Sequence, residues 1–165
     1  MPIIYKVVLL SGGFFTALIA GLFYSYSCSV NIGLGRLPDD AYLRAMQSIN
    51  RAILNSWFFA SFIGTLILLP ICTWMFYTHE AASTGFYLML AATLVYLIGV
   101  FGVTIFGNVP LNEALDKYEI GISLPGELKV RRVQFEKPWN NLNLVRTIGA
   151  VISLLLTLAA LAVRL

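Results

Sequence analysis

Long apolar segments alternate with polar connections along the chain. Four segments are almost free of charged residues, and each is long enough to cross a bilayer, which takes about 20 helical residues. They cover residues 3–32, 53–77, 84–106 and 142–163. The pattern predicts four membrane-spanning helices that belong to a single domain over residues 1–165.

The connections between these segments differ in character. Those after the first and third segments are long and charged, whereas the middle one is short. In the first connection, Asp39 and Asp40 suit the start of a short helix, because negative charge is favourable at a helix N-terminus. In the second, helical periodicity after Pro110 separates two groups of residues. The apolar group is Leu111, Leu115 and Tyr118, and the polar group is Asn112, Asp116 and Glu119. The sequence predicts an all-α integral membrane four-helix bundle with short amphipathic helices in the two long connections.

A proline follows the third apolar segment. Pro110 lacks a backbone N–H and its ring clashes with the preceding turn, so we expect the helix to kink or stop near Asn108. Asn108 can cap the helix that resumes by accepting a backbone N–H. Residues 107–119 are therefore interpreted as a stop, a cap and a restart, which aims Asn112 at the bundle.

Composition narrows the class of protein. The chain is 59% hydrophobic and 12% charged, and a soluble domain of 165 residues would need more polar surface. The net charge of +3 is attributed to the lysine and arginine bias of a membrane protein rather than to nucleic acid. The expected partners are the lipid bilayer and a hydrophobic small molecule, with no nucleic acid, and the oligomeric state is left open.

Lysine and arginine distribution predicts the orientation. Nine of the eleven flank the two long connections, and only Lys6 and Arg164 lie on the other side. Positive residues favour the cytoplasmic face. Both long connections are therefore predicted to be cytoplasmic, with both termini and the short loop outside, in a bacterial inner membrane.

Small residues recur along the apolar segments. At a spacing of four they are Gly13, Ala17, Gly21, Ser25 and Ser29 for the first segment, Ala52, Ser56, Ala60 and Gly64 for the second, and Gly149, Ser153 and Thr157 for the fourth. The third segment has Gly99, and Gly107 follows its end. Such residues let helix backbones approach closely where lipid supplies no hydrophobic force between helices. They indicate a compact bundle and by themselves say nothing about function.

The asparagines all fall on the predicted cytoplasmic side, and helical spacing groups several of them with other polar or aromatic residues. The three groups are Tyr24, Ser27 and Asn31; Gln47, Arg51 and Asn55; and Trp139, Asn143 and Arg146. Polar groups inside a membrane bundle are costly and tend to mark functional sites. We expect one mouth of the bundle to gather Asn31, Arg51, Asn55, Asn112, Asn143 and Arg146.

An alternative stays open for each of these residues. Amides and arginines at helix ends also satisfy backbone groups, and tryptophan and tyrosine form belts at membrane interfaces. For Asn50, Asn140 and Asn141, this structural role is favoured. With a single histidine and two cysteines on different segments, the sequence lacks the ligands for a Cys/His metal site or a bis-histidine haem, so no metal or haem cofactor is expected.

Two motifs resemble a known family. Residues 108–112 form Asn-Val-Pro-Leu-Asn, and residues 139–146 form Trp-Asn-Asn-Leu-Asn-Leu-Val-Arg. With the layout of the four segments, they resemble a family of small four-helix membrane proteins that includes the anthrone oxygenases. The family often has histidine where this chain has Asn143, so an amide replaces a possible acid–base group.

The resemblance implies oxidation of an anthrone to an anthraquinone by molecular oxygen, without evident metal or flavin. Such a reaction needs an apolar pocket, a proton acceptor and donors around a developing oxyanion. The catalytic candidates are Asn112, Asn143, Arg146 and Asp116, the last as a possible base beside Glu113. The substrate-binding candidates are Tyr24, Asn31, Arg51, Asn55 and Trp139. The alternative function is a non-catalytic protein that binds a lipid or quinone at the same mouth.

Overall fold

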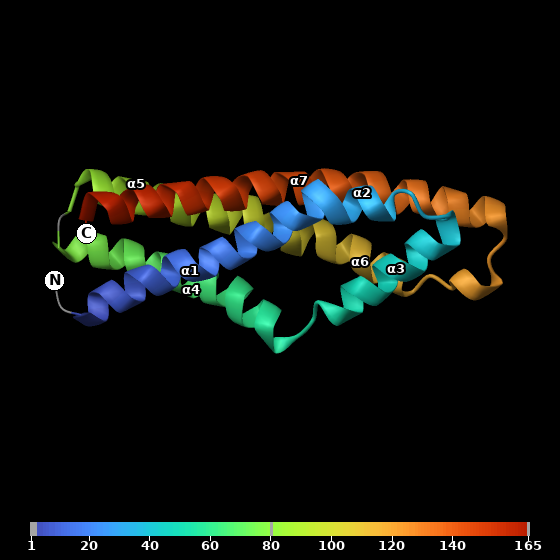
Figure 1. Ribbon diagram of the computed structural model, residues 1–165, viewed down its shortest axis with the longest axis horizontal. Coiled ribbons are helices and arrows are strands. Elements are labelled where there is room, and N and C mark those ends of the chain that lie inside the picture. The colour runs from blue at the N-terminus through green and yellow to red at the C-terminus, as the bar shows by residue number, and fades with distance from the viewer. Residues whose placement is uncertain (1–2, 80, 165) are drawn as a thin grey trace.

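The computed structural model describes residues 3–79 and 81–164, and every regular element in this part of the chain is helical (Figure 1). The α-helices are α1 (Ile3–Ser25), α2 (Asn31–Leu34), α3 (Asp39–Ala52), α4 (Ser56–His79), α5 (Thr84–Val95), α6 (Val109–Asp116) and α7 (Pro125–Arg164). Three π-helical turns, η1 (Tyr26–Val30), η2 (Tyr96–Gly102) and η3 (Thr104–Asn108), and one 3₁₀ turn, η4 (Ile120–Ile122), complete the elements. The predicted all-α fold is confirmed.

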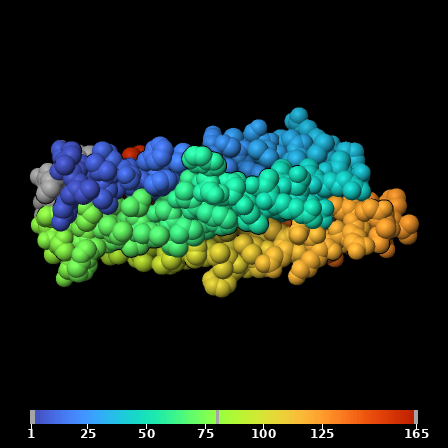
Figure 2. Space-filling view, turned by 90° about the horizontal axis from the view of Figure 1, so that it is seen from below, coloured from blue at the N-terminus to red at the C-terminus, as the bar shows by residue number. Residues whose placement is uncertain are grey.

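Four helical stretches are long and apolar enough to cross a membrane. They are Ile3–Leu34, Ser56–His79, Thr84–Asp116 and Pro125–Val163. α1 packs against α4 and α7, and α5 packs against α4 and α7, which makes a bundle. In Figure 2, α4 runs along one face of the elongated molecule, between α1 and the third stretch. These helices indicate insertion in a membrane.

The two ends of the bundle differ. The start of α1, the α4–α5 connection and the end of α7 lie at one end, and α3, α6 and the start of α7 lie at the other (Figure 1). The stretches of 32, 33 and 39 residues are longer than the roughly 20 needed to cross a bilayer. They therefore extend beyond the apolar layer and build a second, more polar layer of structure with α3.

Pro110 led us to expect a helix stop near Asn108, but the third stretch continues through this position. It continues from η3 into α6 through Pro110, and Val109 donates its N–H to the Thr104 carbonyl, five residues back. The wider π-helical turn accommodates the proline, which an ordinary α-helical turn opposes. Asn108 makes no capping bond, because the helix is continuous and leaves no free N–H to cap. Its buried amide donates to the Trp139 carbonyl at 3.5 Å instead.

The starts of α7 and α4 also differ from the predicted boundaries. α7 is one helix of 40 residues that begins at Pro125, not at residue 142, and passes through Pro138. α4 begins at Ser56 because the Asn55 side chain caps it, accepting from the N–H of Trp57 at 3.0 Å and of Phe58 at 3.1 Å. The polar half of α7 therefore continues the membrane helix as one rod.

α3 is the amphipathic helix predicted in the first connection. Its buried residues are Tyr42, Leu43, Met46 and Asn50, which share one face. This face packs against Leu115, Phe135 and Trp139 in a second apolar cluster, separate from the core of the bundle. Burial raises the pKa of the Tyr42 phenol, and Glu136 adds to this whereas Arg132 opposes it.

Arg132 ties the second layer together. Its guanidinium donates to the carbonyls of Gly35 at 2.8 Å and Leu37 at 2.7 Å, and it pairs with Asp39 at 3.0 Å and Glu136 at 2.7 Å. It also lies 4.6 Å from the centre of the Tyr42 ring. One side chain of α7 thereby fixes the turn between α2 and α3, and so the position of α3.

Candidate functional site: a cavity around Arg146

A cavity lies where the bundle meets the second layer. Its volume is about 90 Å³, and it is partly open to the outside. Its walls come from α1, η1, α3, α4, η3, α6 and α7 and from the α3–α4 connection. The lining residues are Leu22, Phe23, Tyr26, Ile49, Asn50, Ile53, Leu54, Phe58, Thr104, Val109, Asn112, Trp139, Asn143 and Arg146.

Among the described residues of this lining, Arg146 is the only charged one, and it is 6% exposed. Its guanidinium donates to Asn143 Oδ1 at 3.0 Å and to Thr104 Oγ1 at 3.4 Å. It also lies 4.4 Å from the centre of the Phe23 ring and 5.4 Å from that of Trp139. No carboxylate among the described residues pairs with it. A buried cation held only by neutral groups attracts negative charge in a ligand.

Asn143 joins α7 to the first membrane stretch. Its Nδ2 donates to Ser27 Oγ at 3.0 Å, and Ser27 and Thr147 share a hydrogen bond of 2.8 Å. Thr147 also donates to the Phe23 carbonyl at 3.0 Å. The amide is 1% exposed, so its oxygen and nitrogen are both committed inside the protein. Asn143 thus orients the guanidinium of Arg146.

Asn112 and Trp139 form a second pair in the wall. The indole Nε1 donates to Asn112 Oδ1 at 2.8 Å, and Trp139 is 5% exposed. The ring also packs near Tyr26, with 5.8 Å between the ring centres. The continuous helix through Pro110 places Asn112 on the cavity side, one turn beyond the π-helical η3.

A wider hollow adjoins the cavity on its outer side. It is lined by Asn50, Arg51, Leu54, Val109, Asn112, Glu113, Asp116 and Lys117. Four of these residues, Asn50, Leu54, Val109 and Asn112, line the inner cavity too. Arg51 and Asp116 pair across this hollow at 2.5 Å, and both side chains are about half exposed. The hollow offers a polar approach to the buried arginine.

The structure therefore separates the predicted site residues into groups. Asn112, Trp139, Asn143 and Arg146 line the cavity, whereas Arg51 and Asp116 lie in the outer hollow only. The remaining three candidates, Tyr24, Asn31 and Asn55, line neither space. Tyr24 is 58% exposed, and the Asn55 amide is used in capping α4.

Other lining residues were not among the sequence candidates. Phe23, Tyr26 and Thr104 line the cavity, and so does Asn50, which the sequence interpretation assigned to a structural role. A signal for Asn50 was present: it is the one amide on the buried face that α3 otherwise fills with Tyr42, Leu43 and Met46. Phe23 and Tyr26 flank the predicted Tyr24, and a π-helical turn begins at Tyr26.

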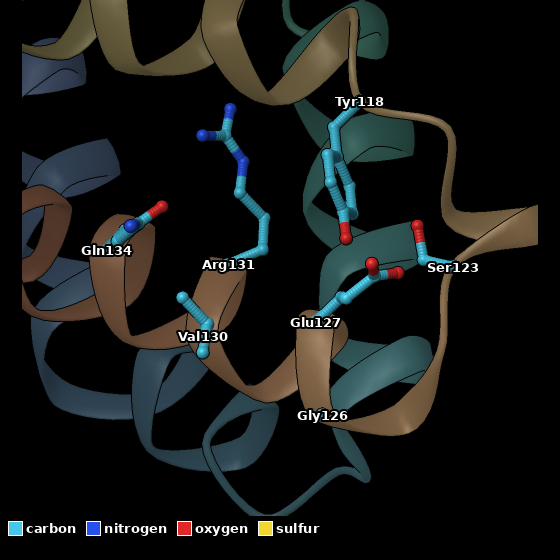
Figure 3. Close-up of a pocket in the computed structure, with 7 residues that line it drawn as sticks. All are labelled: Tyr118, Ser123, Gly126, Glu127, Val130, Arg131 and Gln134. Atoms are coloured by element: carbon cyan, nitrogen blue, oxygen red, sulfur yellow. The ribbon is translucent and has the colours of Figure 1, made fainter.

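A further hollow lies away from this cavity, at the start of α7. Figure 3 shows its lining, with the side chains of Tyr118, Ser123 and Glu127 pointing toward one another. The Arg131 guanidinium donates to the Ala114 carbonyl and lies 5.3 Å from the Tyr118 ring centre. The hollow shares no residue with the cavity around Arg146. Among the described residues, no group of three His, Cys, Asp or Glu side chains is placed to hold a metal ion.

The fold and the cavity define a class: a four-helix membrane protein with a buried cation and amides at one end of its bundle. Comparison with protein families identifies the group. The chain belongs to the anthrone oxygenase family, whose sequence model matches residues 57–156. Searches of curated proteins and of solved structures gave no significant match. The matched region includes Thr104, Asn112, Trp139, Asn143 and Arg146.

Proposed function

We propose that this protein is a membrane oxygenase that oxidises an anthrone-like aromatic compound with molecular oxygen in the cavity around Arg146. One observation carries the proposal: an unpaired, buried arginine lies beside Asn112, Asn143 and Trp139 in an apolar cavity. The region that matches the anthrone oxygenase family contains all four residues.

The reaction begins with loss of a proton. The methylene group of an anthrone is acidic because its carbanion is an enolate, with the charge delocalised onto the carbonyl oxygen. That oxyanion is the species a buried guanidinium and amide N–H groups stabilise. One such donor contributes about 3 kcal/mol in the transition state, which is roughly a hundredfold in rate.

Oxygen is then the oxidant. The enolate transfers electron density to O₂, a carbon–oxygen bond forms, and protonation gives a hydroperoxide at the former methylene carbon. Loss of the second proton from that carbon breaks the O–O bond. The carbon becomes the second carbonyl of the quinone, and the other oxygen leaves as water. One substrate and one O₂ thus give one anthraquinone and one water, and we propose that the protein needs no cofactor for this.

The proposed proton acceptor lies outside the cavity. Asp116, the predicted catalytic carboxylate, and Glu113 line the outer hollow, which shares Asn112 with the inner cavity. Asp116 is held by Arg51 at 2.5 Å. A substrate that crosses this hollow passes both carboxylates before its oxygen reaches Arg146.

Replacing Arg146 tests the proposal. Arg146→Met keeps much of the side chain's length and removes its charge, so we expect at least a hundredfold loss in the rate of anthraquinone formation. The assay uses purified protein with anthrone and follows both quinone absorbance and oxygen uptake. Arg44→Met is the matched control, since Arg44 is exposed on α3 and lines neither space. Equal rates in the wild type and Arg146→Met would contradict the proposal.

A second function also has an observation in its favour. The described residues of the cavity lining include no carboxylate or histidine, so none of them is a conventional base facing the buried arginine. A protein that only binds a quinone or lipid needs none. Recovery of such a molecule unchanged after incubation with oxygen, with no turnover of anthrone, would favour this alternative.

A further inference from the structure

Two buried donors in the cavity have no hydrogen-bond partner in the part of the chain that the structure describes. They are Asn50 Nδ2, on α3, and Arg146 Nε, on α7. Both residues line the cavity, and they are 9% and 6% exposed. A buried donor without a partner is unfavourable, and such groups are rare in folded proteins. Two of them in one cavity point to a ligand that accepts hydrogen bonds.

The amide of Asn112 contributes a third donor. Its Oδ1 accepts from Trp139 Nε1, and an indole nitrogen can only donate. The amide orientation is thereby fixed with the oxygen toward the indole, and the NH₂ group of Asn112 is left without a partner among residues 3–79 and 81–164.

Asn143 is fixed in the same manner. Its Oδ1 accepts from Arg146, which also can only donate, and its NH₂ group binds Ser27. The amide oxygens of Asn112 and Asn143 are therefore both occupied by internal donors within the protein. The donors of Asn50, Asn112 and Arg146 remain available to a ligand.

The titratable groups around the cavity also favour a ligand that accepts hydrogen bonds. Inside the cavity they are Tyr26 and Arg146, and the outer hollow adds Arg51, Glu113, Asp116 and Lys117. The inner lining thus contains a cation and no anion. The carboxylates are confined to the outer hollow, where Arg51 balances Asp116.

From this arrangement we propose that Asn50 is a substrate-binding residue, and that Asn50, Asn112 and Arg146 select the ionised form of an aromatic hydroxy or keto compound. The inference deepens the proposed function and rests on it for the identity of the substrate. The oxygen donors bind an enolate or phenolate better than the neutral molecule, because hydrogen bonds to charged groups are stronger. Ionisation is thus favoured by binding itself, which reduces what a base must do.

The position of Asn50 suits this role. It lines both the inner cavity and the outer hollow, so it lies where the two meet. Its neighbour Arg51 faces the outer hollow only, because successive residues on a helix point about 100° apart. A substrate oxygen that passes the Arg51–Asp116 pair meets the Asn50 amide before it reaches Arg146.

Alizarin, a hydroxyanthraquinone whose colour reports ionisation of its hydroxyl, provides the test. It is not a substrate for the proposed oxidation, so binding is measured without turnover. We expect purified wild-type protein in detergent to lower the pH at which bound alizarin ionises. Asn50→Leu should raise that midpoint by about one pH unit, which is a tenfold weaker preference for the anion. Arg146→Met should raise it further.

Asn141→Leu is the matched control, since Asn141 is exposed and lines neither space. Its midpoint should equal that of the wild type. Asn50→Leu should also keep its thermal stability, because it replaces an unpartnered buried amide with an apolar group of similar size. A loss of the shift is then a change in binding and not in folding.

The outcomes separate this inference from the proposed oxygenase. Equal midpoints in wild type and Asn50→Leu overturn the inference, even if anthrone is oxidised. Failure of the wild type to bind alizarin, or binding without a lowered midpoint, overturns it as well. A lowered midpoint that depends on Asn50, in a protein that does not oxidise anthrone, supports the inference and contradicts the oxygenase.

Discussion

At the scale of single residues, the hydrogen-bond partners of Asn112 and Asn143 influence what the cavity can bind. Trp139 and Arg146 can only donate, and each holds the oxygen of one asparagine. The indole is therefore more than a flat wall for an aromatic ligand: it sets the direction of a neighbouring hydrogen bond.

Trp139→Phe removes the indole N–H and retains an aromatic ring. We expect a loss of about tenfold in anthrone oxidation, because the Asn112 amide is free to rotate and its oxygen can face the substrate. The loss should appear with little change in thermal stability, since most of the buried ring surface remains. Initial rates of quinone formation measure the effect.

Trp57→Phe is the control for this substitution, because Trp57 is 86% exposed and lines neither space. If both variants oxidise anthrone at the wild-type rate, the Trp139–Asn112 bond has no part in the reaction.

Sequence spacing foresaw part of this arrangement. Trp139, Asn143 and Arg146 lie on one face of an uninterrupted α-helix, so their helical spacing brings them to the same cavity. The grouping of Tyr24 with Asn31 assumed the same period in the first segment. There the π-helical turn η1 intervenes, and its wider turn changes which residues share a face. Ser27 still reaches Asn143, whereas Tyr24 points outward. The roles of these residues stay predictions.

At the scale of elements, two glycines set how closely the third and fourth membrane stretches approach. A Cβ added to Gly149 would lie 3.3 Å from backbone atoms of Gly99 and from the Val100 side chain. The sequence suggested close packing at these small residues, and the structure pairs these two.

Gly149→Ala should lower the free energy of unfolding of the purified protein by about 1–2 kcal/mol, because a methyl group at this contact forces the two helices apart. Gly21→Ala is the matched control, as a Cβ at Gly21 meets nothing within 4 Å. That variant should be as stable as the wild type or slightly more so, since alanine favours helix. Equal stability of both variants would mean that the contact is not tight in the membrane.

Arg132→Lys tests the link between α7 and the turn before α3. Lysine cannot reproduce the forked contacts to Gly35, Leu37, Asp39 and Glu136, so we expect a loss of about 2 kcal/mol in stability. Protease cleavage in the α2–α3 turn should become faster. Lys129→Ala, at an exposed position on the same helix, should leave cleavage unchanged.

The helix boundaries show the limits of sequence patterns. Apolar length correctly predicted four long apolar helices, because that signal depends only on composition over some 20 residues. The stop at Asn108 was wrong, since local proline rules assume α-helical geometry and η3 departs from it. The early start of α7 was also missed, because its first turns are polar and pack on α3 instead of lipid.

At the scale of the whole molecule, the arrangement of the ends is testable. Both termini of the described chain lie at the end with the α4–α5 connection, and the second, more polar layer, which contains α3, lies at the other end. We predict that this second layer is cytoplasmic. In a variant lacking Cys28 and Cys72, a cysteine at Lys129 should react with an impermeant maleimide only in inverted vesicles, and one at Thr78 only in whole cells. The reverse pattern would overturn the orientation.

The length of α7 has a consequence for how the protein unfolds. One unbroken helix contributes Phe135 and Trp139 to the outer cluster, Arg146 to the cavity, and Ala150 and Leu161 to the bundle core. The second apolar cluster and the bundle core both pack on α7, so the loss of one disturbs the helix on which the other depends. We therefore expect heat to produce a single cooperative transition, and the cavity, located midway along this shared rod, to be lost with both layers at once.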